Sequence, residues 1–115
     1  MKIELNEKIR EFTPIPDMTL KDMGNVWLDD EEQLTFITES GKTNDIVKKD
    51  WGFYLGNSIN WNLKHQGFKT ALVESCFSGG ERRLYINLVE ADMMSSFEDY
   101  IQKYNAKVIS WLDEA

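Results

Sequence analysis

The sequence is poor in the residues that build disulfides and metal sites. Its 115 residues contain one cysteine, Cys76, and one histidine, His65. An internal disulfide is therefore excluded, and a zinc site made of cysteine and histidine ligands is not expected. Only two prolines are present and the seven glycines form no linker, so no break in composition divides the chain. We expect one domain over residues 1–115, with no metal and no cofactor.

Long hydrophobic runs are also missing. No stretch approaches the roughly 20 consecutive apolar residues that a membrane span needs. The first twelve residues, MKIELNEKIREF, are charged throughout and lack the apolar segment of a signal peptide. A single cysteine favours a reducing compartment. Together these features predict a cytoplasmic protein without a membrane span.

Basic residues are scarce, but they are unevenly distributed. The net charge of −7 argues against a nucleic-acid partner, because binding to phosphate backbones normally requires a basic face. Residues 41–89 nevertheless contain seven basic and four acidic side chains. This middle part would suit an anionic small molecule or an acidic patch on a partner protein. The alternative is that its basic residues only balance the acidic ends of the chain.

Alternating apolar and polar residues indicate strands in much of the chain. The first 20 residues hold both prolines and are expected to form an extended lead-in, with residues 2–12 as an optional edge strand. The motif Ser78-Gly79-Gly80-Glu81 predicts a hairpin between the two clearest strands. Strands are expected at residues 25–29, 33–38, 44–49, 68–77 and 82–90.

Two segments have the features of helices. Asn57 or Ser58 is a suitable N-cap and Gly67 a suitable terminator, which predicts a short middle helix over residues 58–66. Residues 95–98, Ser-Ser-Phe-Glu, fit a capping box. Apolar residues then recur at helical spacing as far as Leu112, so a long C-terminal helix is expected.

The element order β-β-β-α-β-β-α predicts an α+β fold. We expect a mainly antiparallel sheet of about five strands, with the short middle helix and the long C-terminal helix packed on one face. In the strand at residues 82–90, Leu84, Ile86 and Leu88 share the face expected to point into the core. Cys76 is expected to be a small buried side chain.

The stretch 50–67, DWGFYLGNSINWNLKHQG, concentrates side chains suited to binding. Its aromatic rings offer flat apolar faces and its amides offer paired donors and acceptors, the combination with which proteins hold sugar rings and other planar polar ligands. A competing interpretation needs no ligand: the amides cap helices and turns, and the aromatic rings fill the junction between sheet and helix. The predicted ligand or partner site comprises Lys49, Trp51, Tyr54, Asn57, Trp61, Lys64 and His65.

His65 is the one candidate for acid–base catalysis. Its imidazole would need an orienting carboxylate, and Asp50 or Glu74 would have to supply it across the fold. The other interpretation is a surface histidine near the end of a helix, where the helix dipole favours it. Since no spacing motif demands catalysis, we favour a protein without enzymatic activity.

Several segments together resemble a family of small uncharacterised bacterial proteins encoded in surface-polysaccharide and sugar-modification gene clusters. The resemblance rests on LKDMGNVWL, QLTFITESGK, VKKDWGFYLGNSINWNLKHQGFKTALV, RLYINLVE and WLDE, and it is clearest at residues 49–73. That family has no assigned activity, so the resemblance implies only a setting. It implies a cytoplasmic accessory factor beside glycosyltransferases, methyltransferases or nucleotide-sugar enzymes.

The sequence thus predicts an accessory or binding module that acts through a protein partner or a small polar or anionic ligand. One alternative is a small enzyme that acts on a sugar or nucleotide-sugar, with His65 as acid or base. Another is a homodimeric structural protein without a ligand. Both a monomer and a homodimer are compatible with the sequence.

Overall fold

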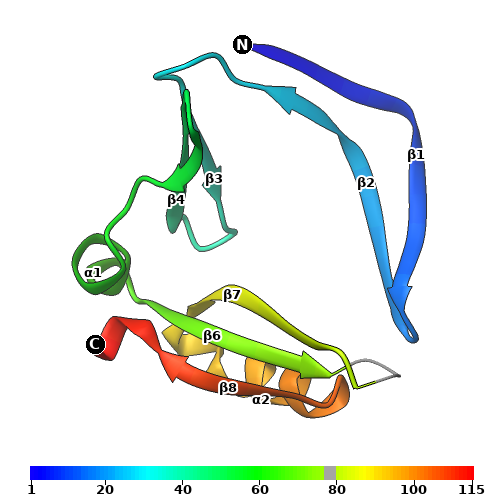
Figure 1. The fold of residues 1–115 in the computed structure, drawn as a ribbon, viewed down its shortest axis with the longest axis vertical. Helices are drawn as coiled ribbons and strands as arrows, with labels where there is room; N and C mark the ends of the chain where they lie inside the picture. Colours follow the sequence, from blue (N-terminus) through cyan, green and yellow to red (C-terminus); the bar gives the residue numbers. More distant parts are fainter. Residues whose placement is uncertain (77–79) are drawn as a thin grey trace. The chain divides into compact units, whose positions relative to one another are not determined.

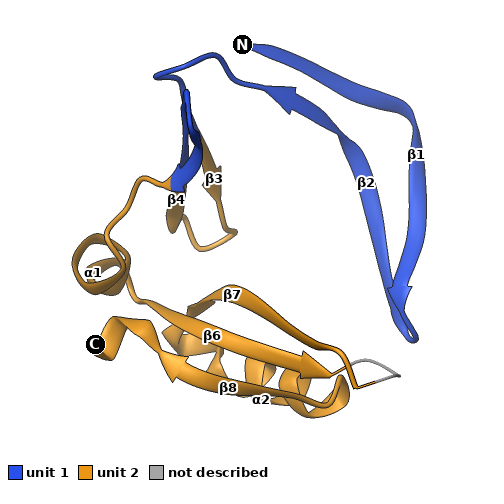
Figure 2. Ribbon diagram, viewed as in Figure 1, with its two compact units in different colours: residues 1–34, 46–54 blue, residues 35–45, 55–115 orange. Residues whose placement is uncertain are grey.

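The structure is a computed structural model that describes residues 1–76 and 80–115. These residues form two compact units, one of residues 1–34 and 46–54 and the other of residues 35–45 and 55–115 (Figure 2). We call them unit 1 and unit 2 and describe each by itself. The expectation of one domain stays a prediction, because the division does not show whether either unit folds without the other.

Unit 1 begins with a long antiparallel hairpin. Strand β1 (Lys2–Ile15) pairs with β2 (Met18–Trp27), and the two appear in blue in Figure 1. The tight turn between them places Asp17 at φ 67°, in the left-handed region that aspartate tolerates better than most residues. The expected extended lead-in is therefore part of a strand that pairs with β2, with register shifts between Leu5 and Arg10 and between Phe12 and Ile15. The strand expected at residues 25–29 is the end of β2.

Gly24 is required because the backbone of β1 passes close to this position of β2. Its φ of 142° is rarely adopted by residues with a side chain. A Cβ atom there would lie 2.2 Å from the carbonyl oxygen of Glu4 and 2.8 Å from the Cα atom of Leu5. Both neighbours are backbone atoms that side-chain rotation cannot move, so this register depends on glycine.

Three short strands follow the hairpin. They are β3 (Gln33–Ile37), β4 (Thr43–Lys49) and β5 (Gly52–Leu55), in the spatial order β3-β4-β5. The first two match the strands expected at residues 33–38 and 44–49. Within unit 1, the acidic turn before β3 is held by Lys48, whose Nζ atom lies 2.7 Å from Asp30 Oδ1. The N–H of Glu31 donates to the Lys48 carbonyl at 2.9 Å.

Unit 2 contains a three-stranded antiparallel sheet in the order β7-β6-β8. Its strands are β6 (Phe68–Cys76), β7 (Arg82–Glu90) and β8 (Ala106–Trp111), and helix α2 (Met94–Lys103) lies along one face (Figure 1). The ring of Phe97 on α2 meets the ring of Trp111 edge-on at 5.9 Å. Ala71 pairs with both Trp111 and Asn87, so these three residues share the face that α2 covers.

The expected long C-terminal helix is wrong. Helix α2 ends at Lys103, Asn105 turns the chain with φ 53°, and the chain continues as β8 and a short 3-10 turn, η3 (Leu112–Glu114). The expected capping box is wrong too, since α2 follows a 3-10 turn, η2 (Ala91–Met93), with no side-chain cap. Over its described residues the fold is mainly sheet, with eight strands instead of about five. The expected antiparallel pairing is confirmed.

The short middle helix is confirmed, although most of it is a π-helix. It comprises η1 (Ile59–Leu63) and α1 (Lys64–Gln66). The Ser58 hydroxyl accepts the N–H of Asn62 at 2.9 Å, and Gly67 ends the helix at φ 99°. Leu63 is fully buried, and η1 contacts both β6 and η3. The residues that suggested a cap and a terminator therefore act as such.

The buried core is small. Buried apolar residues among those described are Val47, Leu63, Phe68, Ala71, Val73 and Val89. Leu84 and Ile86 were expected in the core, but they are 48% and 49% exposed, because their face of β7 is the one that α2 leaves uncovered. Cys76 is also exposed rather than buried.

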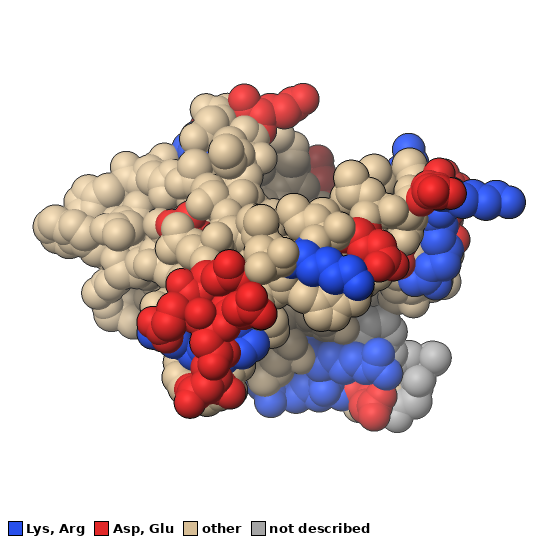
Figure 3. All heavy atoms as spheres, turned by 90° about the horizontal axis from the view of Figure 1, so that it is seen from above, with Lys and Arg blue, Asp and Glu red and all other residues tan. Residues whose placement is uncertain are grey.

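The expected hairpin motif includes residues 78 and 79, which lie outside the described part of the chain. No helix of residues 1–76 or 80–115 is long and apolar enough to span a membrane. In the same ranges no three acidic, histidine or cysteine side chains gather in a way that suits a metal ion. Figure 3 colours Lys and Arg blue and Asp and Glu red, and charged side chains of both signs reach the surface.

Candidate functional site

The seven predicted site residues are divided between the two units. Lys49, Trp51 and Tyr54 belong to unit 1, whereas residues 57, 61, 64 and 65 belong to unit 2. The predicted site therefore consists of two groups of residues, one in each unit. The first group lies in and next to β5, and the second lies on η1 and α1 with their preceding turn.

The first group presents aromatic rings to solvent. Trp51 precedes β5, and Phe53 and Tyr54 lie within it. Their exposed fractions are 68%, 60% and 41%. The rings of Trp51 and Tyr54 stack with 5.9 Å between centroids and an angle of 20°. We call the stacked pair Trp51 and Tyr54 the β5 aromatic surface, since Phe53, the strand neighbour of Tyr54, points to the opposite side of the sheet.

The position of β5 accounts for this exposure. The strand forms one edge of the sheet β3-β4-β5, and it is only four residues long. Gly52 has a φ of 141°, so the turn from β4 brings Trp51 next to the strand that follows. The stack therefore joins a turn residue to a strand residue. Large, stiff aromatic groups held in this way are typical of the centres of protein interfaces.

Lys49 is committed to an ion pair. Its Nζ atom lies 2.8 Å and 2.9 Å from the two carboxylate oxygens of Glu31. This hydrogen bond raises the pKa of Lys49 above its ordinary value, with smaller contributions from the charges of Glu31 and Tyr54. Lys49 thus helps to hold the acidic turn against β4. A ligand that used its charge would have to displace Glu31.

The second group centres on Trp61 and His65. The two rings meet edge-on with 4.3 Å between centroids, as expected for residues four positions apart in a helix. His65 Nδ1 lies 2.7 Å from the backbone carbonyl oxygen of Trp61. A carbonyl oxygen only accepts, so Nδ1 carries the hydrogen and Nε2 is the free acceptor of the neutral ring. Trp61 is 65% exposed.

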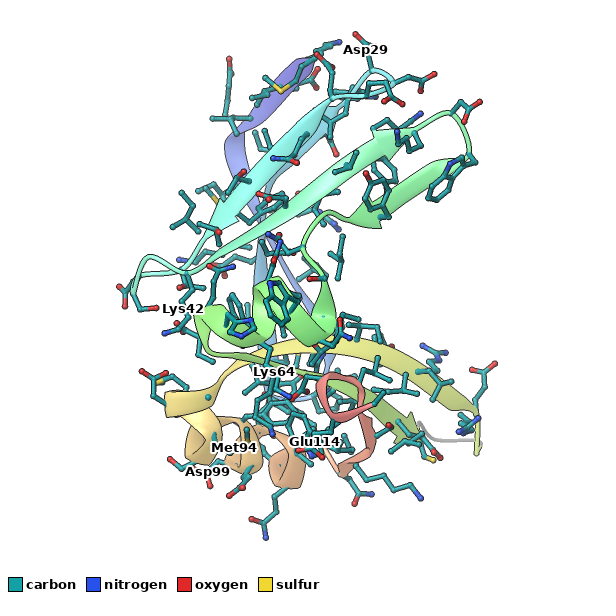
Figure 4. All side chains as sticks on the ribbon, turned by 90° about the vertical axis from the view of Figure 1, so that its left-hand side faces the viewer. Asp29, Lys42, Lys64, Met94, Asp99 and Glu114 are labelled. Carbon is teal, nitrogen blue, oxygen red and sulfur yellow. The ribbon has the colours of Figure 1, made fainter. Side chains whose placement is uncertain are left out.

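The other polar residues of the second group hold the backbone. Asn57 Oδ1 accepts the N–H of Asp45 at 2.8 Å. Lys64 Nζ donates to the carbonyl oxygen of Asp113 at 3.2 Å, and Figure 4 shows Lys64 between its helix and the C-terminal turn. Gln66 accepts the N–H of Thr43 at 2.8 Å and donates to its carbonyl oxygen at 3.0 Å. These contacts support the interpretation in which the amides build the fold.

A catalytic role for His65 stays a prediction. Glu74, one of its two suggested partners, instead lies with Oε2 3.1 Å from Arg82 Nε. That hydrogen bond holds the pKa of Glu74 below its ordinary value. Asp50, the other suggested partner, belongs to unit 1. In the described part of unit 2, no carboxylate hydrogen-bonds to the His65 ring.

Sequence reasoning missed a groove in unit 2. The groove lies between β7 and α2, has a volume of about 450 Å³, and is open to solvent. Val89, Met93, Phe97 and Tyr100 line much of it. The alternation of residues in β7 indicated two faces, but it did not indicate that α2 would cover the face of Asn87 and Val89. The groove is therefore a product of tertiary packing, with no local signal.

A second missed feature lies at the end of β7. The Glu90 carboxylate accepts hydrogen bonds from the hydroxyls of Ser40 and Thr38, the latter at 3.2 Å, and lies 3.4 Å from Lys42 Nζ. The bond from Ser40 is the main reason why the pKa of Glu90 lies below its ordinary value. These contacts tie the turn after β3 to the sheet of unit 2.

No protein-family model, curated protein or solved structure matches this chain.

Proposed function

We propose that the chain is a non-catalytic accessory protein that binds a partner protein through the β5 aromatic surface. The observation that carries this proposal is the exposure of the stacked rings of Trp51 and Tyr54 at one short edge strand. The resemblance of the sequence to proteins from surface-polysaccharide gene clusters suggests the setting, a cytoplasmic assembly that builds or modifies sugars.

The size of the surface suits the centre of a protein interface. An aromatic side chain presents about 150–250 Å², so Trp51 and Tyr54, at 68% and 41% exposure, present on the order of 200 Å². A stable interface covers about 800 Å² on each partner. The β5 aromatic surface would form its apolar centre, and polar residues around it would form the rim.

The stack of Trp51 on Tyr54 lowers the cost of binding. Side chains that become fixed on association lose about 0.5–1.5 kcal/mol each in conformational freedom. Two rings that already rest on each other at 5.9 Å have lost part of that freedom in the unbound protein. The pair is therefore partly organised for contact before a partner arrives.

A protein partner is favoured over a small polar ligand. Recognition of a sugar needs amide or charged groups that converge beside the ring. Asn57 and Gln66, which the sequence suggested for this purpose, form hydrogen bonds to the backbone of Asp45 and Thr43 instead. Lys49 is paired with Glu31. The exposed rings, in contrast, need only an apolar surface opposite them.

Copurification followed by a direct binding measurement tests the proposal. The tagged protein is recovered from cells that naturally make it, copurifying proteins are identified, and each is purified and titrated by calorimetry. We expect the Trp51→Ala, Tyr54→Ala double variant to bind its partner at least about tenfold more weakly, the loss typical of interface centres. Phe36→Ala is the matched control, since Phe36 is also aromatic and 54% exposed but lies on β3.

The same experiment distinguishes the other functions. Equal binding by the wild type and the double variant would refute the role of the β5 aromatic surface. A nuclear magnetic resonance titration with monosaccharides and nucleotide-sugars tests the small-ligand alternative. Shifts of the Trp51 indole N–H signal with these compounds, and no protein partner, would replace the proposed protein interface with a sugar site.

A further inference from the structure

Strand β7 has an unusually open edge for pairing. It lies at one edge of the sheet β7-β6-β8, and its nine residues pair with β6 without a register shift. The opposite edge strand, β8, has a register shift beside Leu72 and Val73, which bends it. Proteins protect edge strands with bulges, prolines or charges within the strand. Between residues 84 and 89, β7 has none of these.

The middle of β7 is exposed on both faces. Leu84, Tyr85 and Ile86 are 48%, 45% and 49% exposed, although three consecutive strand residues cannot all point to one side of a sheet. A strand that completed this sheet would cover part of all three side chains. The exposed hydrophobic edge is thus a site where another strand is expected to add.

The sequence of β7 is complementary to itself in the antiparallel direction. The strand Arg82–Glu90 is centred on Ile86, so two copies paired about that residue overlap along their whole length. Ile86 would then face Ile86 of the second copy, and Leu84 would face Leu88. Cross-strand pairs of such apolar side chains stabilise a sheet. A second copy of β7 is therefore itself a suitable partner strand for this edge.

The charges at the ends of β7 fit the same pairing. In this register Arg82 of each copy lies opposite Glu90 of the other, and opposite charges at facing positions are favourable, with Glu90 shared between Arg82 and Lys42 of its own chain, whose Nζ lies 3.4 Å away. Arg82 already contacts Glu74 through Nε at 3.1 Å, but its side chain is 57% exposed and its other N–H groups can serve a second carboxylate. We propose that the protein forms a symmetric dimer in which β7 of two copies pair antiparallel about Ile86.

The dimer would extend the sheet without changing its two faces. A two-fold axis perpendicular to the sheet joins the two three-stranded sheets into one of six strands and keeps both α2 helices on the same side. The two grooves between β7 and α2 would then face each other across the junction. Tyr85 of one copy would stand opposite Asn87 of the other, on the face that bears both grooves.

Cysteine crosslinking tests this register directly. In a background in which Cys76 is replaced by serine, Ile86→Cys places two cysteines opposite each other at about 4.5–5.5 Å between Cα atoms, close enough for mild oxidation to form a disulfide. Leu84→Cys is the matched control, because residue 84 faces residue 88 and its two copies lie about 13 Å apart along the strands. We expect rapid covalent dimers for the first variant and at least about tenfold slower ones for the second.

Light scattering after size exclusion provides the second measurement. The wild type is expected to run as a dimer at micromolar concentration. Ile86→Lys places two like charges opposite each other and should raise the dissociation constant at least about tenfold, while its exposed position leaves the fold intact. A wild type that stays monomeric over this range would overturn the proposal. So would a dimer that Ile86→Lys leaves unchanged, or equal crosslinking at residues 84 and 86.

Discussion

Asp113 anchors the C-terminal turn, and its replacement by alanine should be strongly destabilising. Its side chain is only 3% exposed, and Oδ1 accepts the backbone N–H of Thr70 at 2.9 Å. Oδ2 lies 3.8 Å from Lys69 Nζ. Alanine would leave a buried N–H without an acceptor, which costs about 1–3 kcal/mol. Loss of the partly exposed ion pair adds up to about 1 kcal/mol.

We therefore expect Asp113→Ala to lower the free energy of unfolding by about 1–4 kcal/mol. Asp113→Asn keeps an oxygen acceptor for Thr70 and loses only the ion pair, so its expected cost is about 1 kcal/mol or less. Urea unfolding followed by tryptophan fluorescence measures both, and the midpoint of the alanine variant should fall by roughly 0.5–4 M for an m-value of about 1–2 kcal/mol/M.

Glu114→Ala serves as the control, because Glu114 is 60% exposed and should contribute little. Equal losses for the alanine and asparagine variants would show that the charge of Asp113, and not its acceptor oxygen, stabilises the turn. A loss below about 0.5 kcal/mol for Asp113→Ala would refute the anchor itself, since buried groups that lose a partner cost more than this.

Other predictions follow from single positions. Gly24→Ala forces backbone atoms apart and should cost at least about 2 kcal/mol in urea unfolding, more than Gly52→Ala, where φ is similar but space is open. Thr70→Val should stabilise by about 1 kcal/mol, because the buried hydroxyl has no partner among the described residues. The pKa of Glu90 is lowered by hydrogen bonds in the folded protein, so its contribution to stability is present at neutral pH and disappears as pH falls through that lowered value. Glu90→Gln should reduce the fall in the free energy of unfolding between neutral and acidic pH. An unchanged pH dependence would contradict the role of Glu90.

Local sequence features predicted several elements well because their causes are local. Ser58 caps the middle helix and Gly67 ends it, since a hydroxyl acceptor and a left-handed φ depend little on the rest of the fold. The alternation in residues 68–76 and 82–90 likewise predicted both strands. Trp61 and His65 lie four positions apart in that helix, and their rings are in contact.

The prediction of a long C-terminal helix was wrong because the spacing of the apolar residues there fits both a helix and a strand. Phe97 and Ile101 lie four residues apart within α2, whereas Val108 and Trp111 follow in β8. Their spacing continues the helical stripe, but branched and aromatic residues also favour strands. The deciding residue is Asn105, which adopts a left-handed conformation after the helix, as asparagine does more readily than most residues.

The prediction of which face of β7 is buried was wrong for a different reason. Alternation shows that Ile86 and Asn87 point to opposite sides, but it does not show which side a helix will cover. The more apolar side was assigned to the core, and α2 instead packs over the side of Asn87 and Trp111. The mistake is informative, because an apolar face that the chain leaves uncovered is a reason to look for a second strand or a second protein.

The small core explains why side chains that bind the backbone matter so much here. A domain of this size normally relies on a large buried apolar surface, and the described residues bury only six apolar side chains to less than a tenth exposure. Turns are instead held by single contacts, such as Asn57 to Asp45, Gln66 to Thr43 and Asp113 to Thr70. Polar residues thus stabilise the fold, and apolar residues such as Trp51 and Ile86 remain at the surface. The proposals for β5 and β7 share this physical basis, since both assign exposed apolar groups to contacts that the single chain does not make.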